Sequence, residues 1–293
     1  MPNGVPLTGG LALGCAFVVV SLIGLFYGRA PSAQSMGLVM SSLIMLILGV
    51  VDDLHELSVG TKFLAQLVCA FILIIFGIKT QIVYIGELAN VVITLVWVLA
   101  ITNALNHLDV MDGVAGGCAL IIALAFFIVS GFGSHPQILA LALMGSILGF
   151  LIFNLPPAQI YMGNSGSHFL GFVLAEFSLT INYASLERKV ALLSPLLILG
   201  FPLYDTAFLI LMRLKKKRLP FKKSNDHLVL RFLALGYSKK KALSVMFSWT
   251  LFFALSGIAL SRAANPAGAA IIAVVAVASL LLTGKMSGIK VSD

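Results

Sequence analysis

Residues 89–113 read ANVVITLVWVLAITNALNHLDVMDG, and this stretch decides the fold class. Residues 89–106 are mostly apolar and have the length of a membrane-crossing helix, which needs about 20 residues. The polar residues that end the stretch are spaced by three, so a helix would present Asn106, Asp109 and Asp112 on one face. The stretch therefore predicts a membrane helix with an acidic end.

The whole chain has the composition of a membrane protein. Of its 293 residues, 60% are hydrophobic and 10% are charged, and the mean hydropathy is +1.07. Soluble domains carry about 25% charged residues, so this chain cannot cover a soluble surface. We predict an all-α, polytopic transmembrane helical bundle that forms one integral membrane domain over residues 1–293. Its ten predicted spans are 9–28, 34–51, 61–78, 89–106, 114–132, 136–155, 166–184, 191–211, 242–261 and 267–283.

Charge gives the orientation of these spans. An even number of spans puts both termini on one side, and eleven of the 19 Lys and Arg residues lie between Arg213 and Lys241. With the termini in the cytoplasm, 14 of the 19 lie inside and 5 outside, as the positive-inside rule favours. The predicted cytoplasmic loops are about 52–60, 107–113, 156–165 and 212–241. The net charge of +8 then reflects topology, and without a soluble basic domain we expect no nucleic acid partner.

Polar side chains gather in the predicted cytoplasmic loops, and the outer loops have nothing comparable. Polar groups are costly in hydrocarbon and tend to mark functional sites. The asymmetry favours a site open to the cytoplasm. A transporter would need polar groups near the midplane and often has inverted repeats, and we find no repeat in the sequence.

Two acidic clusters suit a divalent cation. Carboxylate, water and phosphate oxygens are the ligands that Mg²⁺ prefers, so Asp109 and Asp112 are candidate ligands beside Asn106. The adjacent carboxylates of Asp52 and Asp53 repel each other unless a cation neutralises them. The alternative interpretation of both clusters is a solvated helix end.

Three further positions could contact an anionic substrate. Lys62 begins the next predicted helix and could pair with a phosphate or with an acid. Gly163 lies in a Gly-rich loop before a helix, whose N-terminal amides could hold an anion, although such residues are more often a helix cap. His227 is a titratable base in the basic loop beside Asp226, and a lone histidine is more often incidental.

Together these segments resemble the polyprenyl-phosphate N-acetylhexosamine-1-phosphate transferase superfamily, from about Val5 to Ser238. The motifs occur in the family's order. They are Val5-Pro6-Leu7-Thr8-Gly9-Gly10, Asp52-Asp53 with Lys62 and Gln66, Asn103 to Gly113, Met162-Gly163-Asn164-Ser165-Gly166-Ser167, Phe201-Pro202-Leu203-Tyr204-Asp205-Thr206, and the basic loop.

The resemblance implies site residues and a cofactor. By position it implies that Asp52, Asp53, Asp109 and Asp112 are catalytic, with Mg²⁺ or alternatively Mn²⁺ as the cofactor. It implies a substrate contact for the loop histidine and a metal ligand at the position of the family's Met-Gly-Asp aspartate. With the residues identified above, the predicted substrate-binding residues are Lys62, Asn106, Gly163 and His227, and the predicted metal ligands are Asp109, Asp112 and Asn164.

Several positions depart from the family's pattern. The metal-binding aspartate is Asn164 here, the first glycine of the Asp-Gly-x-Asp-Gly run is Val110, and only His227 remains of the His-x-His-His cluster. An amide oxygen brings no negative charge, so the affinity for Mg²⁺ should fall. The usual first span and the basic stretch before Gly9-Gly10 are also missing from this sequence.

The expected reaction is transfer of a sugar 1-phosphate from a UDP-N-acetylhexosamine to a polyprenyl (undecaprenyl) phosphate, with release of UMP. It would occur at the bacterial inner membrane, with the active site facing the cytoplasm, in cell-envelope polysaccharide synthesis such as that of teichoic acid or lipopolysaccharide. The sequence leaves a homodimer open. The alternatives are an intramembrane aromatic prenyltransferase, which also uses Asp-rich motifs, and a catalytically impaired homologue that binds lipid phosphate or UDP-sugar without turnover.

Overall fold

The computed structural model describes residues 5–28, 31–185, 187–217, 225–289 and 291. Every regular element among these residues is a helix, which confirms the predicted all-α class. The chain divides into two compact units, residues 1–182 and 183–293. The predicted single domain stays a prediction, and each unit is described by itself below.

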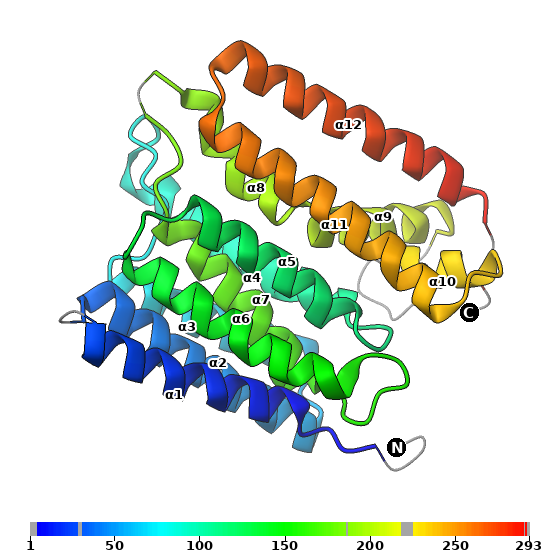
Figure 1. Cartoon of the computed structure of the whole chain (residues 1–293), viewed down its shortest axis with the longest axis horizontal. Helices are drawn as coiled ribbons and strands as arrows, with labels where there is room; N and C mark the ends of the chain where they lie inside the picture. Colours follow the sequence, from blue (N-terminus) through cyan, green and yellow to red (C-terminus); the bar gives the residue numbers. More distant parts are fainter. Residues whose placement is uncertain (1–4, 29–30, 186, 218–224, 290, 292–293) are drawn as a thin grey trace. The chain divides into compact units, whose positions relative to one another are not determined.

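The described residues of the first unit form seven helices. They are α1 (Gly9–Gly28), α2 (Ala33–His55), α3 (Val59–Ile75), α4 (Gly86–Leu108), α5 (Val114–Val129), α6 (His135–Asn154) and α7 (Gly163–Thr180). Figure 1 shows them as neighbouring rods, from α1 in blue to α7 in green. Serine side chains cap the starts of three helices by accepting a backbone N–H bond, as N-cap residues commonly do. These caps are Ser32 at α2, Ser58 at α3 and Ser134 at α6.

Helix α7 is the core of the first unit. It packs against α2 and α4 most extensively, and every residue from Ser165 to Ser178 is buried. Glycines permit the closest approaches, since a Cβ at Gly171 would lie 2.7 Å from Thr102 Cα and one at Gly10 would lie 2.2 Å from Gly166 N. A residue larger than glycine at these positions would push α4 or α1 away from α7.

The second unit contains η2 (Lys189–Leu193), α8 (Ser194–Ile198), α9 (Gly200–Lys215), α10 (Leu228–Ala234), α11 (Lys239–Arg262) and α12 (Asn265–Ser287). Helices α11 and α12 form an antiparallel pair, joined by the short turn around Ala264. The Tyr204 hydroxyl of α9 donates to the Ser279 carbonyl of α12 at 3.0 Å. Hydrogen bonds of this kind connect membrane helices that packing alone holds weakly.

Six helices of the described chain are long and apolar enough to cross a membrane, namely α1, α2, α4, α6, α11 and α12. The segment 189–215 would be a seventh if its two parts, bent by 69°, form one span. Helical residues overlap each of the ten predicted spans, but the span 191–211 is divided among η2, α8 and α9, and α3 and α5 have only 17 and 16 residues. The chain is therefore a multi-pass membrane protein by length and composition, and the number of ten spans stays a prediction.

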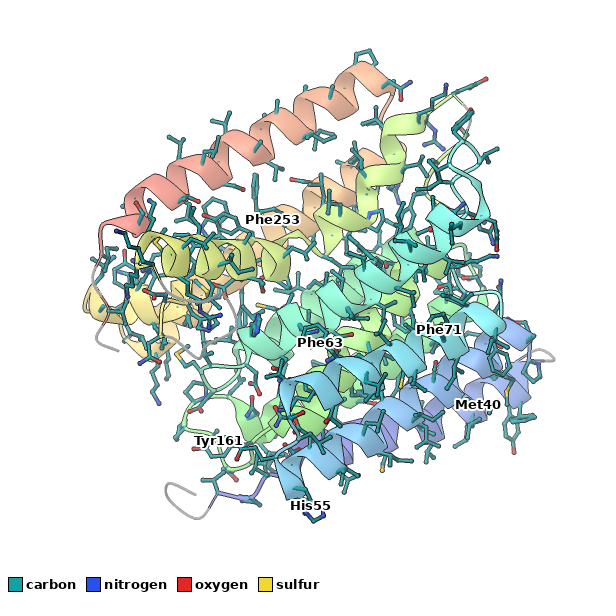
Figure 2. The ribbon with its side chains drawn as sticks, turned by 180° about the vertical axis from the view of Figure 1, so that it is seen from behind. Met40, His55, Phe63, Phe71, Tyr161 and Phe253 are labelled. Carbon is teal, nitrogen blue, oxygen red and sulfur yellow. The ribbon has the colours of Figure 1, made fainter. Side chains whose placement is uncertain are left out.

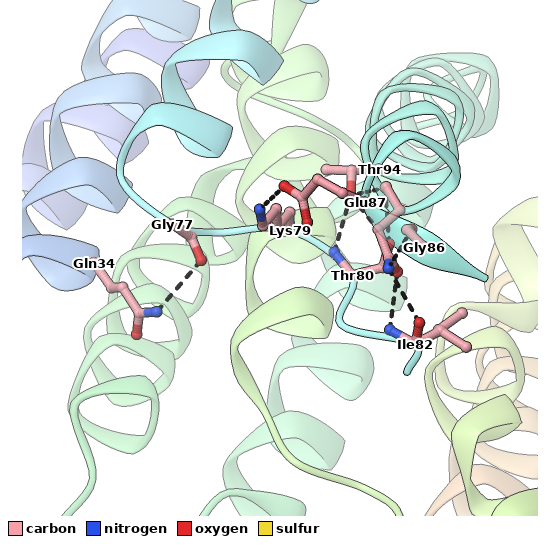
Figure 3. Close-up of polar contacts among 9 residues, drawn as sticks. Gln34, Gly77, Lys79, Thr80, Ile82, Gly86, Glu87 and Thr94 are labelled. Atoms are coloured by element: carbon pink, nitrogen blue, oxygen red, sulfur yellow. Dashed lines mark hydrogen bonds and ion pairs between the residues drawn. The ribbon is translucent and has the colours of Figure 1, made fainter. Parts of the chain in front are cut away.

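The loop between α3 and α4 closes one end of the first unit through polar contacts (Figure 3). The Thr80 amide donates to Thr94 Oγ1 at 2.9 Å, and the Ile82 amide donates to Asn90 Oδ1 at 2.9 Å. Lys79 forms an ion pair with Glu87. The polar groups here bind one another, so this end serves the fold and contrasts with the opposite end, where the predicted site lies.

Candidate active site

The ends of α2 and α4 and the start of α7 bring the predicted site residues of the first unit to one end, which we call the acidic end. Figure 2 shows His55, at the end of α2, and Tyr161, just before α7, at this end. Met40 and Phe71 lie toward the opposite end. Segments more than 100 residues apart in sequence therefore meet, as the motif order predicts.

Asp53 binds the first turn of α7. Its Oδ1 accepts the Asn164 amide at 2.7 Å, and its Oδ2 accepts the Ser165 amide at 2.9 Å. Free amides and the helix dipole make a helix start favourable for a negative charge. The anion that the Gly-rich loop was predicted to bind is thus a carboxylate of the protein itself.

Gly163 makes this approach possible. Its φ of +68° lies in the left-handed region, and a Cβ at this position would lie 2.7 Å from Asp53 Oδ2. Glycine adopts such a φ without steric cost, and it leaves room for the carboxylate. Gly163 therefore has a clear structural role, and its predicted contact with substrate stays a prediction.

Asp52 is buried and already has two partners. Its Oδ2 lies 2.8 Å from Lys62 Nζ, and its Oδ1 accepts the Leu57 amide at 2.8 Å. The sequence left either a phosphate or an acid as the partner of Lys62, and in the structure the partner is the acid Asp52. The pair connects the end of α2 to the start of α3 and keeps the Lys62 side chain, which is 26% exposed, at the acidic end.

Asn106 and Asn164 meet across α4 and α7. Asn106 Nδ2 donates to Asn164 Oδ1 at 3.2 Å and to Ser167 Oγ at 2.9 Å. One turn earlier on α4, Asn103 Nδ2 donates to Gln66 Oε1 at 2.7 Å. This row of amides aligns three helices, and the Asn164 amide oxygen that would meet a metal is held in place by Asn106.

Asp109 follows the end of α4 and is partly buried. Burial, followed by the nearby charges of Asp112 and Asp53, raises the pKa of Asp109 to about 7. In the described part of the chain no lysine, arginine or histidine forms an ion pair with Asp109. The turn after it is fixed by Gly113, whose φ is +80° and whose amide donates to Asn154 Oδ1 at 2.9 Å.

The oxygen ligands at the acidic end suit a divalent cation that also binds a phosphate. Among the described residues no three His, Cys, Asp or Glu side chains are arranged as a metal cage. Mg²⁺ rarely occupies such cages, since it keeps waters and takes one or two carboxylates plus substrate phosphates. Asp109 and Asp112 fit that requirement. Asp112 lies close enough to raise the pKa of Asp109, and no lysine or arginine of the described residues pairs with Asp109.

Sequence reasoning assigned no role to His168, which the structure places at the acidic end. It is buried in α7, one turn after Asn164, and lines a small cavity. The other lining residues are Met45, Leu48, Gly49, Asp52, Leu57, Lys62, Ala65 and Gln66. The i,i+4 spacing from Asn164 is the signal that could have identified His168.

The second unit holds His227. Its Nδ1 lies 3.0 Å from Asp205 Oδ2, and the Leu228 amide donates to Asp205 Oδ1 at 3.0 Å. Its sequence neighbour Asp226 instead binds Lys216 and Arg231. Residues 218–224 of the basic loop lie outside the described residues. The predicted substrate contact of His227 stays a prediction.

The sequence model of a known family, glycosyl transferase family 4, matches residues 35–182, about half of the chain. The chain belongs to this family. The matched residues include every site residue of the acidic end, from Asp52 to His168. Membership confirms the predicted resemblance.

Named relatives extend over most of the chain. It is 32% identical to the probable undecaprenyl-phosphate N-acetylglucosaminyl 1-phosphate transferase of Bacillus subtilis, across 88% of this chain and 74% of the relative. It is 30% identical to the decaprenyl-phosphate N-acetylglucosaminephosphotransferase of Mycobacterium tuberculosis, across 89% and 73%. It is 29% identical to the phospho-N-acetylmuramoyl-pentapeptide-transferase of Caldicellulosiruptor bescii, across 88% and 83%. The first two names describe transfer of an N-acetylglucosamine phosphate and none of the three describes a prenyltransferase, which favours the phosphotransferase class over an aromatic prenyltransferase.

Proposed function

We propose that the protein transfers a sugar 1-phosphate, from UDP-N-acetylhexosamine, to polyprenyl phosphate and releases UMP. The observation that carries the proposal is the meeting of Asp53, Asn106, Asp109 and Asn164 at one end of the first unit, within a family whose named relatives act on polyprenyl phosphates. In the reaction, an oxygen of the carrier phosphate attacks the β-phosphorus, and the bond from that phosphorus to the oxygen bridging to UMP breaks.

Phosphoryl transfer needs alignment and charge neutralisation more than covalent help from the protein. Asp109 and Asp112 would hold Mg²⁺ or Mn²⁺, with Asn164 Oδ1 as a neutral third oxygen. A bound ion would neutralise the negative charge of the diphosphate. Asn106 would fix the orientation of Asn164, because its side chain already donates to that oxygen.

The acidic pair would have two different roles. Asp53 would hold the start of α7 through the amides of Asn164 and Ser165. Asp52 would orient Lys62, whose partly exposed ammonium would bind the carrier phosphate. A carrier phosphate enters as an anion with an attacking oxygen that already lacks its proton, so no strong base is required of either aspartate.

The distribution of charge supports a cytoplasmic active site in the bacterial inner membrane. In the topology predicted from the sequence, 14 of the 19 Lys and Arg residues lie in cytoplasmic segments, as the positive-inside rule favours. UDP-sugars are soluble, so the site must open to the compartment that contains them. The protein would act there as a monomer or as a homodimer.

The experiment is an assay of the purified, lipid-supplemented protein with UDP-N-acetylglucosamine, other UDP-N-acetylhexosamines and undecaprenyl phosphate. UMP release that depends on both substrates and on Mg²⁺ supports the proposal. Asp112→Asn should abolish this release. Glu87→Gln should not change it, because Glu87 is an exposed acid paired with Lys79 outside the acidic end.

A second function follows from Asn164, which replaces a charged ligand of the family by a neutral amide. The protein could bind lipid phosphate or UDP-sugar without turnover. Binding of either substrate with no UMP release at any Mg²⁺ or Mn²⁺ concentration would favour this function, and release of pyrophosphate from a prenyl diphosphate would favour a prenyltransferase. Either result would overturn the proposed transfer.

A further inference from the structure

Glu176 is a buried carboxyl group that the proposed chemistry does not use. It lies in α7 and is fully buried. The Ser41 hydroxyl donates to its Oε1 at 2.6 Å, and the Ser42 hydroxyl donates to its Oε2 at 3.0 Å. Ionisable groups inside membrane helices are costly and are usually retained for a function. A bridge from α7 to two adjacent serines of α2 is therefore informative about what this helix pair must do.

The same two helices also meet at the acidic end. Helix α2 ends there with Asp53, and α7 begins there with the amides that Asp53 accepts. Ser41 precedes Asp53 by 12 residues, and Glu176 follows Asn164 by 12 residues. With a rise of about 1.5 Å per residue, both intervals are about 18 Å. The helices are antiparallel, so the two polar links lie in register along one interface.

Close packing between the links makes the register matter. A Cβ at Gly49 of α2 would lie 2.5 Å from Ser165 Cα of α7. Any axial slip of α2 would move Gly49 off this contact and would separate Asp53 from the Asn164 and Ser165 amides. Dispersion contacts are non-directional, so the apolar residues of the interface do not by themselves define one axial position of α2 on α7. Two hydrogen bonds to one carboxyl group define that position, because hydrogen bonds require a particular geometry.

We propose that Glu176 is a positioning residue, whose bridge to Ser41 and Ser42 sets the register of α2 on α7 and thereby holds Asp53 against the amides of Asn164 and Ser165. The expected effect of Glu176 on the rate of UMP release rests on the proposed function. The expected effect on the protection of the Asn164 and Ser165 amides does not, because it concerns only how α2 packs on α7.

The first test compares variants of the whole protein in lipid. Glu176→Leu should lower kcat by about tenfold to a hundredfold and change the KM for UDP-sugar less, because misplacement by about 1 Å can cost about a hundredfold. Glu176→Gln should restore most of the rate, since its amide oxygen can accept from one serine and its NH₂ group can donate to the other. A Gln variant as slow as the Leu variant would contradict a role through these hydrogen bonds.

A triple variant separates the positioning role from a simple loss of folding. It combines Ser41→Ala, Ser42→Ala and Glu176→Leu, so all three polar partners become apolar. Such a change is often tolerated because no buried group is left unpaired. The matched control is Ser146→Ala, which removes a buried hydroxyl that donates to the Ala142 carbonyl of its own helix at 2.9 Å. A triple variant that unfolds at the wild-type temperature and keeps the wild-type kcat would overturn the proposal.

Hydrogen exchange supplies a readout that needs no activity. The amides of Asn164 and Ser165 should exchange at least about tenfold faster in Glu176→Leu and in the triple variant, and at the wild-type rate in Ser146→Ala. Unchanged exchange in a folded variant would overturn the positioning role. If the wild type releases no UMP, the proposed function fails, and the exchange rates still decide whether Glu176 sets the register.

Discussion

Apart from Asp52, which pairs with Lys62, the aspartates discussed in the two units differ in how their charge is compensated. In the second unit, Asp226 is 1% exposed and accepts from Lys216 at 2.9 Å and from Arg231 at 2.6 Å, and Asp205 binds His227 and the Leu228 amide. At the acidic end, Asp53 accepts two neutral amides, and Asp109 has neighbouring acids that raise its pKa to about 7. Paired carboxylates connect elements of the fold, whereas a crowded acid without a lysine or arginine partner is available for a cation.

Of the variants that test this comparison, Asp109→Asn should give the largest effect. The variant loses a carboxylate that is poised to hold the metal, and UMP release should fall about a thousandfold, which corresponds to about 4 kcal/mol of transition-state stabilisation. The thermal unfolding temperature in detergent should stay the same or rise, because a partly buried acid beside two others is removed. A rate within tenfold of the wild type, or a large loss of stability, would break the comparison at the acidic end.

Asp226→Asn should show the opposite behaviour, with stability lost. Arg231 is 2% exposed, and its Nη1 also donates to the Met286 carbonyl at 2.8 Å, so loss of the negative charge leaves a buried cation without its partner. The free energy of unfolding should fall by about 2–3 kcal/mol, somewhat below the usual cost of breaking a buried pair because Lys216 is part-exposed. Denaturant unfolding of detergent-solubilised protein measures the change.

The matched control is Glu87→Gln, which removes an ion pair whose acid is 71% exposed. Exposed pairs contribute about 0–1 kcal/mol, so this variant should unfold almost as the wild type does. An Asp226 variant as stable as the Glu87 variant would show that the second unit does not depend on its compensated acids.

Gly163→Ala tests the contact between Asp53 and the start of α7. The new Cβ would lie 2.7 Å from Asp53 Oδ2, and the φ of +68° is one that alanine rarely adopts. Both the backbone strain and the clash with Asp53 should therefore lower the stability. Gly133→Ala is the control, because its φ is +66° and no atom lies within 4 Å of the new Cβ. Because the strain of a positive φ is common to both variants, the Gly163 variant should lose about 1–2 kcal/mol of stability more than the control from displacement of the part-buried Asp53 contact. Equal losses would mean that the Asp53 contact contributes nothing.

Sequence reasoning identified the acidic end because polar side chains at the ends of apolar runs are informative in membrane proteins. Asp53, Asn106 and Asp109 were found in this way and Asn164 through the resemblance to the family, and the structure brings them together. The occupant of the α7 amides could not be foreseen, since any anion satisfies them, and the packing of α2 on α7, where Gly49 lies against Ser165, brings Asp53 there. The sequence likewise could not decide whether α3, α5 and α7 each cross the membrane, because a buried helix and a short span have the same composition.

Glu176 shows the same limit. It lies inside the predicted span 166–184, where a carboxyl group is costly, but its partners Ser41 and Ser42 lie more than 130 residues away, in a helix where serine is not unusual. A polar residue in a membrane segment can be recognised from sequence, whereas its partner depends on which helices are neighbours. Only the antiparallel pairing of α2 with α7 reveals that Glu176 and Asp53 lie on the same interface.

Asn164→Asp should give the smallest effect and should sharpen the comparison most. It adds one negative charge at the acidic end and keeps an oxygen that can accept from Asn106 Nδ2, now at 3.2 Å from Asn164 Oδ1. A third acid at the metal should lower the Mg²⁺ concentration for half-maximal activity by about tenfold, which is about 1.4 kcal/mol. The measurement is a Mg²⁺ titration of UMP release, with Asn103→Asp as the control, because Asn103 lies one turn earlier on α4 and binds Gln66. If Asn164→Asp needs more Mg²⁺ than the wild type, the added charge repels its acidic neighbours more than it attracts the ion, and Asn164 is then not a ligand.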